Sequence, residues 1–254
     1  MDSGTVANSG KIGLWRRLLA EYLGCLLLTA TVVGSGIAAQ SLSPTDVGLQ
    51  LFENAAATAT GLLAIILMFG AVSGAHLNPV ISFVDAAFGG ISWRHASAYL
   101  PAQVAGCISG AVLANVMFSL KVVSLSAHHR ASGPHLISEI VATAGLVLIV
   151  FALARTGRDS ITPAAVGAYI GAAYFFTSST SFANPAIAIG RMFSNSFAGI
   201  AASSVPPFIG AEIVGGLVGF AVIAILYPGS APEKVPGVVV PPRVESPPNS
   251  PPET

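Results

Sequence analysis

The chain has 254 residues, of which 53% are hydrophobic and only 9% are charged. Soluble domains carry about 25% charged residues, so this composition excludes an ordinary water-soluble fold and predicts a protein embedded in a lipid membrane. The formal net charge is zero, which removes the electrostatic basis for binding nucleic acid.

Apolar stretches long enough to cross a bilayer recur along the chain. Crossing the hydrocarbon core takes about 20 apolar residues as a helix. The six predicted spans are Leu18–Ala39, Phe52–Val72, Ala96–Phe118, Leu136–Ala154, Ile161–Ser178 and Phe208–Tyr227. Residues 1–17 are expected to form a flexible N-terminus, and residues 231–254, with three Pro-Pro pairs, a disordered tail. Residues 18–230 are predicted to form one all-α membrane domain.

Two inserts lie between these spans, and each contains an Asn-Pro pair. The first insert, Ser73–Gly90, carries Asn78-Pro79-Val80, and the second, Ser179–Pro207, carries Asn184-Pro185-Ala186. Asn is a favoured helix N-cap and Pro is favoured at the first helical position, so each pair predicts the start of a helix. Both inserts are interrupted by Gly, Pro and polar residues, which favours re-entrant half-helices that line a watery cavity.

The two halves of the chain repeat. Glu21 in Ala20–Gly24 matches Glu139 in Ser138–Ala142, and the two Asn-Pro inserts correspond. The predicted repeats cover residues 18–120 and 136–228. Each has three spans, an odd number, so the second copy must be inverted in the membrane. Inverted repeats with broken helices place a solute path at the repeat interface.

The distribution of Lys and Arg predicts the orientation. The positive-inside rule favours the arrangement with both termini in the cytoplasm, by eight cations against three. The eight on the inner side would be Lys11, Arg16, Arg17, Arg94, Arg155, Arg158, Lys234 and Arg243. The three on the outer side would be Lys121, Arg130 and Arg191.

Residues 73–80, Ser-Gly-Ala-His-Leu-Asn-Pro-Val, and residues 182–186, Phe-Ala-Asn-Pro-Ala, resemble the paired Asn-Pro-Ala boxes of the aquaporins, or major intrinsic proteins. The resemblance covers roughly Leu18 to Tyr227. It implies a passive channel formed by six membrane-spanning helices and two half-helices, assembled as a homotetramer. Val80 departs from the family pattern, in which Ala is usual, and is expected to alter local packing without abolishing conduction.

The resemblance also implies a selectivity filter on the outer side of the boxes. Counted from the two asparagines, its four positions are Thr58, Ala172, Ser181 and Ile187, with Gly171 as the alternative to Ala172. Members of the family usually have Arg directly after the second box, where this chain has Ile187. The implied filter is wide, mostly uncharged and able to admit neutral solutes bulkier than water.

The absence of a filter Arg, combined with Thr-Ser-Ser-Thr-Ser-Phe at residues 177–182 ahead of the second box, resembles a bacterial subgroup linked to arsenic-resistance operons. The implied solutes are arsenite as As(OH)3 or methylated arsenicals, with glycerol-like polyols and water as alternatives, and the implied location is the bacterial plasma membrane. Buried acids and inverted repeats also suit a proton-coupled transporter, which is the alternative class. An enzyme is not expected, because we find no nucleophile–base pair, metal cluster or phosphate loop. No cofactor or metal is predicted.

Several further polar and aromatic residues are candidates for the pore and its support. Glu21 and Glu139 resemble acids that brace the re-entrant loops by accepting backbone N–H groups, and such acceptors are needed wherever a loop is broken inside a membrane. His76 and Phe182 are expected to line the pore. Arg191 shares a helical face with Asn184 and Ile187. It either adds a positive charge at the outer vestibule, or interacts with the dipole at the C-terminus of its helix, or snorkels to headgroups.

Overall fold

The computed structural model describes residues 12–228, which fold into helices and connecting loops, with no strand among them. The helices are α1 (Leu14–Leu42), α2 (Val47–Ser73), α3 (Pro79–Phe88), α4 (Trp93–Met117), α5 (Gly133–Arg155), α6 (Thr162–Phe176), α7 (Pro185–Arg191) and α8 (Val205–Leu226). Two short 3-10 turns, Asp159–Ile161 and Ala202–Ser204, precede α6 and α8.

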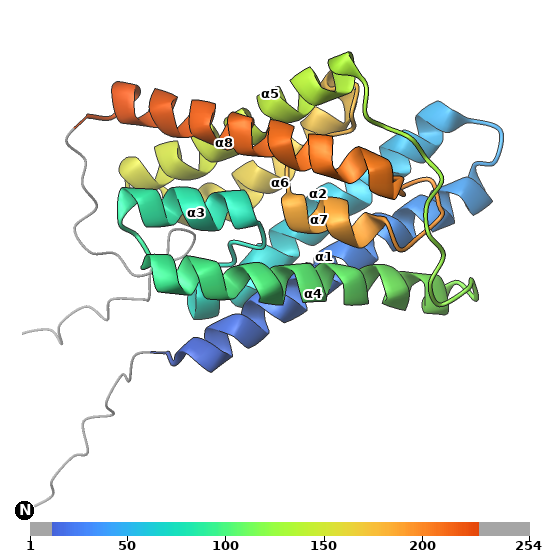
Figure 1. Cartoon of the computed structure of the whole chain (residues 1–254), viewed down its shortest axis with the longest axis horizontal. Helices are drawn as coiled ribbons and strands as arrows, with labels where there is room; N and C mark the ends of the chain where they lie inside the picture. The colour runs from blue at the N-terminus through green and yellow to red at the C-terminus, as the bar shows by residue number, and fades with distance from the viewer. Residues whose placement is uncertain (1–11, 229–254) are drawn as a thin grey trace, which may run out of the picture.

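The long helices run side by side, and the two short helices, α3 and α7, lie among them (Figure 1). The short helices begin near the middle of the bundle and run toward opposite ends (Figure 1). The described chain begins and finishes at the same end, which we call the terminal end, the other being the opposite end (Figure 1). The re-entrant arrangement predicted for the two Asn-Pro inserts is therefore present.

The packing repeats between the two halves. Helix α1 packs on α4 as α5 packs on α8, and α2 packs on α6 across the repeat interface. Glycines permit the close approach within each half. A Cβ added to Gly106 of α4 would lie 2.3 Å from the Tyr22 carbonyl oxygen, and one added to Gly215 of α8 would lie 2.6 Å from the Ile140 oxygen. Small residues at such contacts let helices in membranes pack by close van der Waals contact.

The predicted fold class, an all-α membrane protein with paired half-helices, is confirmed. Five of the described helices are long and apolar enough to cross a membrane, namely α1, α2, α4, α5 and the stretch that contains α8. The fifth predicted span, Ile161–Ser178, yields only the 15-residue α6. At 1.5 Å per residue such a helix is about 22 Å long, shorter than the hydrocarbon core of about 30 Å.

The boundary predicted at the N-terminus needs a correction. Helix α1 begins at Leu14, so residues 14–17, predicted to belong to a flexible N-terminus, are helical. The prediction placed the start of the helix at Leu18 because Arg16 and Arg17 interrupt the apolar run. Arg is nevertheless a good helix former, so the helix extends through both residues. The predicted tail, 231–254, and residues 1–11 lie outside the described residues.

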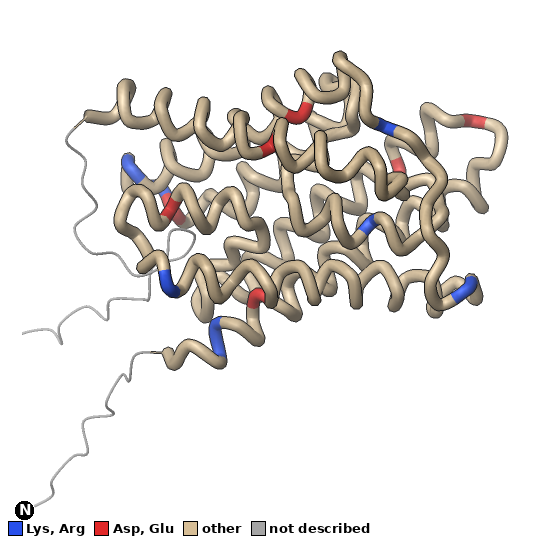
Figure 2. The backbone as a smooth tube through the Cα atoms, in the orientation of Figure 1, with Lys and Arg blue, Asp and Glu red and all other residues tan. Residues whose placement is uncertain are grey.

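Charged residues gather toward the two ends of the bundle, with a few acidic positions in its middle (Figure 2). The cations in the helices and turns of the terminal end are Arg16, Arg17, Arg94, Arg155 and Arg158. The cations of the opposite end are Lys121, Arg130 and Arg191. Within residues 12–228 the terminal end therefore carries more Lys and Arg residues than the opposite end, five against three.

Candidate functional site

The two Asn-Pro boxes meet at the centre of the molecule. Asn78 caps α3, its Oδ1 accepting a hydrogen bond from the Val80 N–H at 2.9 Å, and Asn184 caps α7 in the same way through the Ala186 N–H at 3.0 Å. The side-chain amide of Asn78 donates to the Ala183 carbonyl at 2.7 Å. Because two helix N-termini face this region, their partial positive charges add where the boxes meet.

The loops that lead into the boxes share an unusual backbone. Ala75 and Leu77 in the first loop have φ of 46° and 54°, and Ser181 and Ala183 in the second have 51° and 47°. Non-glycine residues rarely adopt this left-handed region, and each such residue costs of order 1 kcal/mol unless its surroundings hold it.

Glu21 of α1 holds the first loop. Its Oε1 accepts from the Ser73 hydroxyl at 2.6 Å and from the His76 N–H at 3.0 Å. Its Oε2 accepts from the Leu77 N–H at 2.7 Å and from the Gln103 side-chain amide at 2.8 Å. All acceptor sites of a buried carboxylate are thereby occupied, and the loop N–H groups that no helix can satisfy have a partner.

Two acids hold the second loop. Glu139 of α5 accepts from the Phe182 N–H at 2.9 Å and from the Ala183 N–H at 2.7 Å. Glu212 of α8 accepts from the Asn184 N–H at 3.0 Å. The contact of Glu212 was not expected from the sequence, although the repeat holds a signal for it. Residues 102–106 match residues 211–215, so Glu212 occupies the position that Gln103 holds in the first half.

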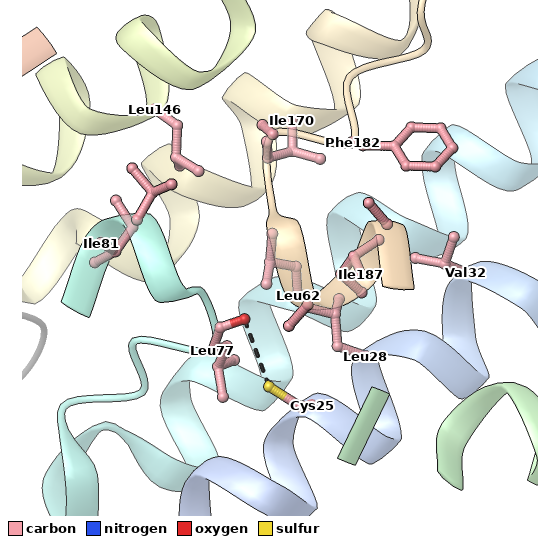
Figure 3. Packing of buried hydrophobic residues seen from close by; sticks show 14 of the residues in the cluster. Cys25, Leu28, Val32, Leu62, Leu77, Ile81, Leu146, Ile170, Phe182 and Ile187 are labelled. Carbon is pink, nitrogen blue, oxygen red and sulfur yellow. Dashed lines mark hydrogen bonds between the residues drawn. The ribbon is translucent and has the colours of Figure 1, made fainter. Parts of the chain in front are cut away.

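A cavity of about 70 Å³ passes the boxes and continues to both sides of them. Roughly 10–15 Å³ on the same measure holds one water molecule, so the space accommodates a short file of waters. Polar groups on its wall include Thr58, His76, Asn78, Ser181, Asn184 and Arg191. The remaining wall is largely aliphatic, with Leu28, Leu62 and Ile187 among the residues that point into the space between the helices (Figure 3).

Of the four predicted filter positions, Thr58, Ser181 and Ile187 lie on the cavity wall. The hydroxyl of Ser181 is buried and has no hydrogen-bond partner within the described part of the chain, so it is available to a molecule in the cavity. Ile187, on the first turn of α7, is 4% exposed and presents only methyl groups.

The predicted position on α6 is wrong. Ala172 is exposed on the outer surface, and a side chain at the alternative, Gly171, would meet Ala59 of α2 at 2.9 Å. Tyr174 faces the cavity instead, as do the residues at steps of four before it, Ile170 and Val166. Ala172 and Tyr174 are two residues apart, which corresponds to a rotation of about 200° around the helix axis. An error of two residues in the position counted from the second box therefore selects the opposite face of α6.

Tyr174 brings a hydroxyl to the filter. Its OH lies 3.0 Å from the Thr58 hydroxyl oxygen, and both side chains are buried. At this predicted filter position a phenol therefore stands on the cavity wall where the sequence predicted a methyl group, and it adds one hydroxyl to the wall. The spacing of four along 162, 166, 170 and 174 is the sequence signal that identifies this face.

Arg191 and Phe182 lie near the second box, on the side that faces the opposite end of the bundle. Arg191 is 2% exposed, lines the cavity and stacks on Phe182, its guanidinium carbon lying 3.5 Å from the ring centroid. Its Nε donates to the Ala198 carbonyl. The burial of Arg191 argues against snorkelling, whereas its place in the last turn of α7 suits the helix dipole as well as a charge at the vestibule.

His76 lies on the other side of the boxes, on the cavity wall. Its Nδ1 is 3.1 Å from the Ser82 hydroxyl, and its Nε2 is 3.4 Å from a carboxylate oxygen of Asp85, which is 1% exposed. Asp85 was missed in the sequence, although it stands seven residues after Asn78, two turns along the same face of the predicted half-helix.

Cys25 also touches the first loop, donating to the Leu77 carbonyl at 3.5 Å (Figure 3). Cys25 belongs to α1 and Leu77 lines the cavity, so this hydrogen bond links α1 to the cavity wall. This contact adds to the hydrogen bonds from Glu21 that hold the loop in its left-handed conformation.

Paired half-helices whose capped ends meet beside a continuous cavity define a membrane channel. The chain belongs to the major intrinsic protein family, whose sequence profile matches residues 8–218. It is 44% identical to "Aquaglyceroporin AqpS" of Rhizobium meliloti (strain 1021) over 219 residues, which cover 86% of this chain and 93% of that protein. It is 28% identical to "Lens fiber major intrinsic protein" of Gallus gallus over 232 residues, 84% of this chain and 80% of that one.

A solved structure has the same fold. The X-ray structure of the aquaglyceroporin from Plasmodium falciparum matches with a TM-score of 0.63 at 17% identity, over 84% of this chain and 96% of that one. The protein is thus a passive membrane channel for small neutral solutes and not an enzyme, and the alternative of a proton-coupled transporter is set aside.

Proposed function

We propose that this channel conducts small neutral hydroxylated solutes larger than water, with arsenite as As(OH)3 or methylated arsenicals as the leading candidates. Glycerol-like polyols and water would also pass, while protons and ions would not. Asn78 and Asn184 would donate hydrogen bonds to the solute at the boxes. Thr58, Tyr174, Ser181 and Ile187 would form the filter, with Phe182 and Arg191 beyond it and His76 at the other side.

The observation that carries the proposal is Ile187. A solute in a filter must exchange its hydration for groups on the wall, and a fixed cation at this position would favour a narrow path for water. Here the wall offers an aliphatic side chain, the unpartnered Ser181 hydroxyl and the Thr58–Tyr174 hydroxyl pair. Such a surface suits a molecule that is both a hydroxyl donor and an acceptor and has an apolar side, such as As(OH)3 or a polyol.

The likeness to a bacterial aquaglyceroporin over 86% of the chain supports a solute range wider than water. The alternative is a channel that conducts mainly water. Tyr174 favours this alternative more than the predicted Ala172 did, because its phenol narrows the filter. In the proposed filter the hydroxyls of Thr58, Tyr174 and Ser181 offset this narrowing, because they can replace the water that a hydroxylated solute loses.

We further propose that the protein resides in a bacterial plasma membrane as a homotetramer with both termini in the cytoplasm. The orientation is supported by the excess of Arg at the terminal end, five against three Lys and Arg within the described residues. The apolar outer faces of the helices would contact lipid and neighbouring subunits.

Stopped-flow light scattering on proteoliposomes tests the proposal. Vesicles with the purified full chain and empty vesicles are compared for osmotic water flow and for uptake of glycerol and of arsenite at neutral pH. We expect glycerol and arsenite uptake well above that of empty vesicles, unchanged by a protonophore. Water flow without solute uptake would favour the water channel, and uptake that a protonophore abolishes would contradict passive conduction.

A further inference from the structure

Two arginines, from different parts of the chain, converge on Phe182 at the opposite end of the bundle. The Arg191 guanidinium carbon lies 3.5 Å from the ring centroid, and that of Arg130 lies 5.5 Å from it. Arg191 belongs to α7, whereas Arg130 lies in the connection between α4 and α5. Cations within about 6 Å of an aromatic face are attracted by its quadrupole. Phe182 and Arg191 lie on the cavity wall, whereas Arg130 is not one of the lining residues and lies behind them, against the Phe182 ring.

The same two arginines bind three consecutive carbonyls. Arg130 donates through Nη2 to the Phe197 carbonyl at 2.8 Å and through Nε to the Gly199 carbonyl at 2.7 Å. Arg191 donates through Nε to the carbonyl between them, that of Ala198. The backbone N–H of Arg130 also donates to the Ser204 hydroxyl at 2.9 Å. Both guanidinium groups are therefore held in fixed positions.

Within residues 12–228 no carboxylate forms a salt bridge with Arg130 or Arg191. Glu139 acts on both arginines, and Glu212 on Arg191, through charge at longer range. The hydrogen bonds of these two acids go to backbone N–H groups of the second loop. Burial lowers the pKa of Arg130, while Tyr174 and Glu139 raise it, and a guanidinium keeps its proton at neutral pH.

We propose that Arg130 is a second determinant of cation exclusion, acting with Arg191 and Phe182 as a two-arginine barrier at the outer mouth. The barrier stands one helical turn beyond Ile187 and supplies the positive charge that the filter lacks. A charge held close to the path and partly shielded from water repels a cation strongly, whereas a neutral solute passes it. The inference rests on the channel function alone and not on which neutral solute is conducted.

Ion entry into proteoliposomes tests this role. A potassium diffusion potential set with valinomycin drives protons and sodium inward, followed with dyes trapped inside, while osmotic water flow reports an intact channel. The variants are Arg130→Gln, which keeps a donor but removes the charge, Arg130→Lys, which keeps the charge, and Arg191→Gln. Lys121→Gln is the matched control, because Lys121 is exposed in the same connection.

We expect Arg130→Gln and Arg191→Gln each to raise ion entry about tenfold, because each removes one unit of positive charge that repels an entering cation at short range. Lys121→Gln and Arg130→Lys should match the unmodified chain in ion entry, and Lys121→Gln should also keep its water flow. Unaltered ion entry in Arg130→Gln overturns the proposal. So does equal leakage through Arg130→Lys and Arg130→Gln, because Arg130 would then only clamp the 197–199 carbonyls.

A second measurement applies if Arg130→Gln does not fold. In Arg130→Lys the charge can be titrated, since lysine loses its proton at about pH 9–11, whereas the arginine of the unmodified chain does not. Sodium entry through Arg130→Lys should therefore rise across that range while sodium entry through the unmodified chain stays flat. Equal curves for the two proteins would contradict a barrier that depends on the charge at this position.

Discussion

Asn78 and Asn184 cross-link the two re-entrant loops reciprocally. The amide of Asn78 donates to the carbonyl just before Asn184, that of Ala183, and the amide of Asn184 donates to the carbonyl just before Asn78, that of Leu77, both at 2.7 Å. Each asparagine thus caps its own half-helix with its oxygen and fixes the partner loop with its nitrogen. Each amide retains a second N–H, which can donate to a molecule in the cavity.

Replacing Asn78 with Ala should destabilise the protein measurably. The substitution removes an N-cap, worth about 1–2 kcal/mol, and leaves the buried Ala183 carbonyl without this partner, which costs about 1–3 kcal/mol more. We expect a clear fall in the thermal unfolding midpoint in detergent. Asn195→Ala is the control, because Asn195 is exposed and the hydrogen bond that it accepts, from the Ala127 N–H at 3.1 Å, lies at the surface. Equal midpoints for the two variants would show that the cross-link does not stabilise the fold.

Removing the Tyr174 hydroxyl should slow conduction. Tyr174→Phe leaves the cavity shape nearly unchanged but deletes the partner of Thr58 and one hydroxyl of the filter. We expect several-fold slower glycerol uptake and a stability loss of about 1 kcal/mol. Tyr169→Phe is the matched control on the same helix. The Tyr169 hydroxyl donates to the Ala142 carbonyl at 3.1 Å, and Tyr169 does not line the cavity. It should lose similar stability and keep the uptake rate.

Much of this architecture could be predicted because it depends on local patterns. Apolar runs identified every long helix to within five residues at each end, since a membrane helix must bury its backbone groups over a defined length. The Asn-Pro pairs located the starts of α3 and α7, since capping is a property of adjacent residues. Ser181 and Ile187 lie on the cavity wall, as their distance of three residues from Asn184 allows little freedom.

Features that depend on helix rotation or on distant pairings could not be found this way. The position on α6 is separated from its box by a loop of unknown path, and so Ala172 was chosen where Tyr174 faces the cavity. Arg130 contacts Phe182 from the connection between α4 and α5, which lies outside both Asn-Pro inserts. Asp85 approaches His76 only because α3 folds back beside the loop that precedes it. The spacings of Tyr174 and Asp85 mark helix faces but do not say what those faces meet, and the pairing of Arg130 with Phe182 leaves no spacing signature in a single sequence.

Introducing Arg at position 187 should narrow the solute range. Ile187→Arg puts a long cationic side chain into a cavity of about 70 Å³, one turn from Arg191. We expect glycerol and arsenite uptake to fall at least tenfold while water flow falls much less, since bulky solutes need the space that the guanidinium fills. Ile187→Leu controls for packing, because it keeps the volume without charge, and should behave like the unmodified chain. Undiminished glycerol uptake in Ile187→Arg would contradict a filter at this position.

Replacing Glu139 with Gln tests whether this acid braces the second loop or relays protons. Its two carboxylate oxygens accept the N–H groups of Phe182 and Ala183, whereas Gln has one acceptor oxygen and would turn an NH2 group toward the second N–H. We expect Glu139→Gln to lower stability by about 1–3 kcal/mol, the penalty for one unsatisfied buried donor.

Solute flux per folded channel should keep the pH dependence of the unmodified chain, because no proton moves through a bracing carboxylate. Glu53→Gln is the control for loss of charge, since Glu53 is only half-buried and accepts from the Ser43 hydroxyl at 2.8 Å. Thermal unfolding and uptake between pH 5 and 8, about the range of physiological titration, separate the two roles. A stable Glu139→Gln variant with an altered pH profile would favour the relay, because bracing affects stability whereas a relay affects how flux depends on pH.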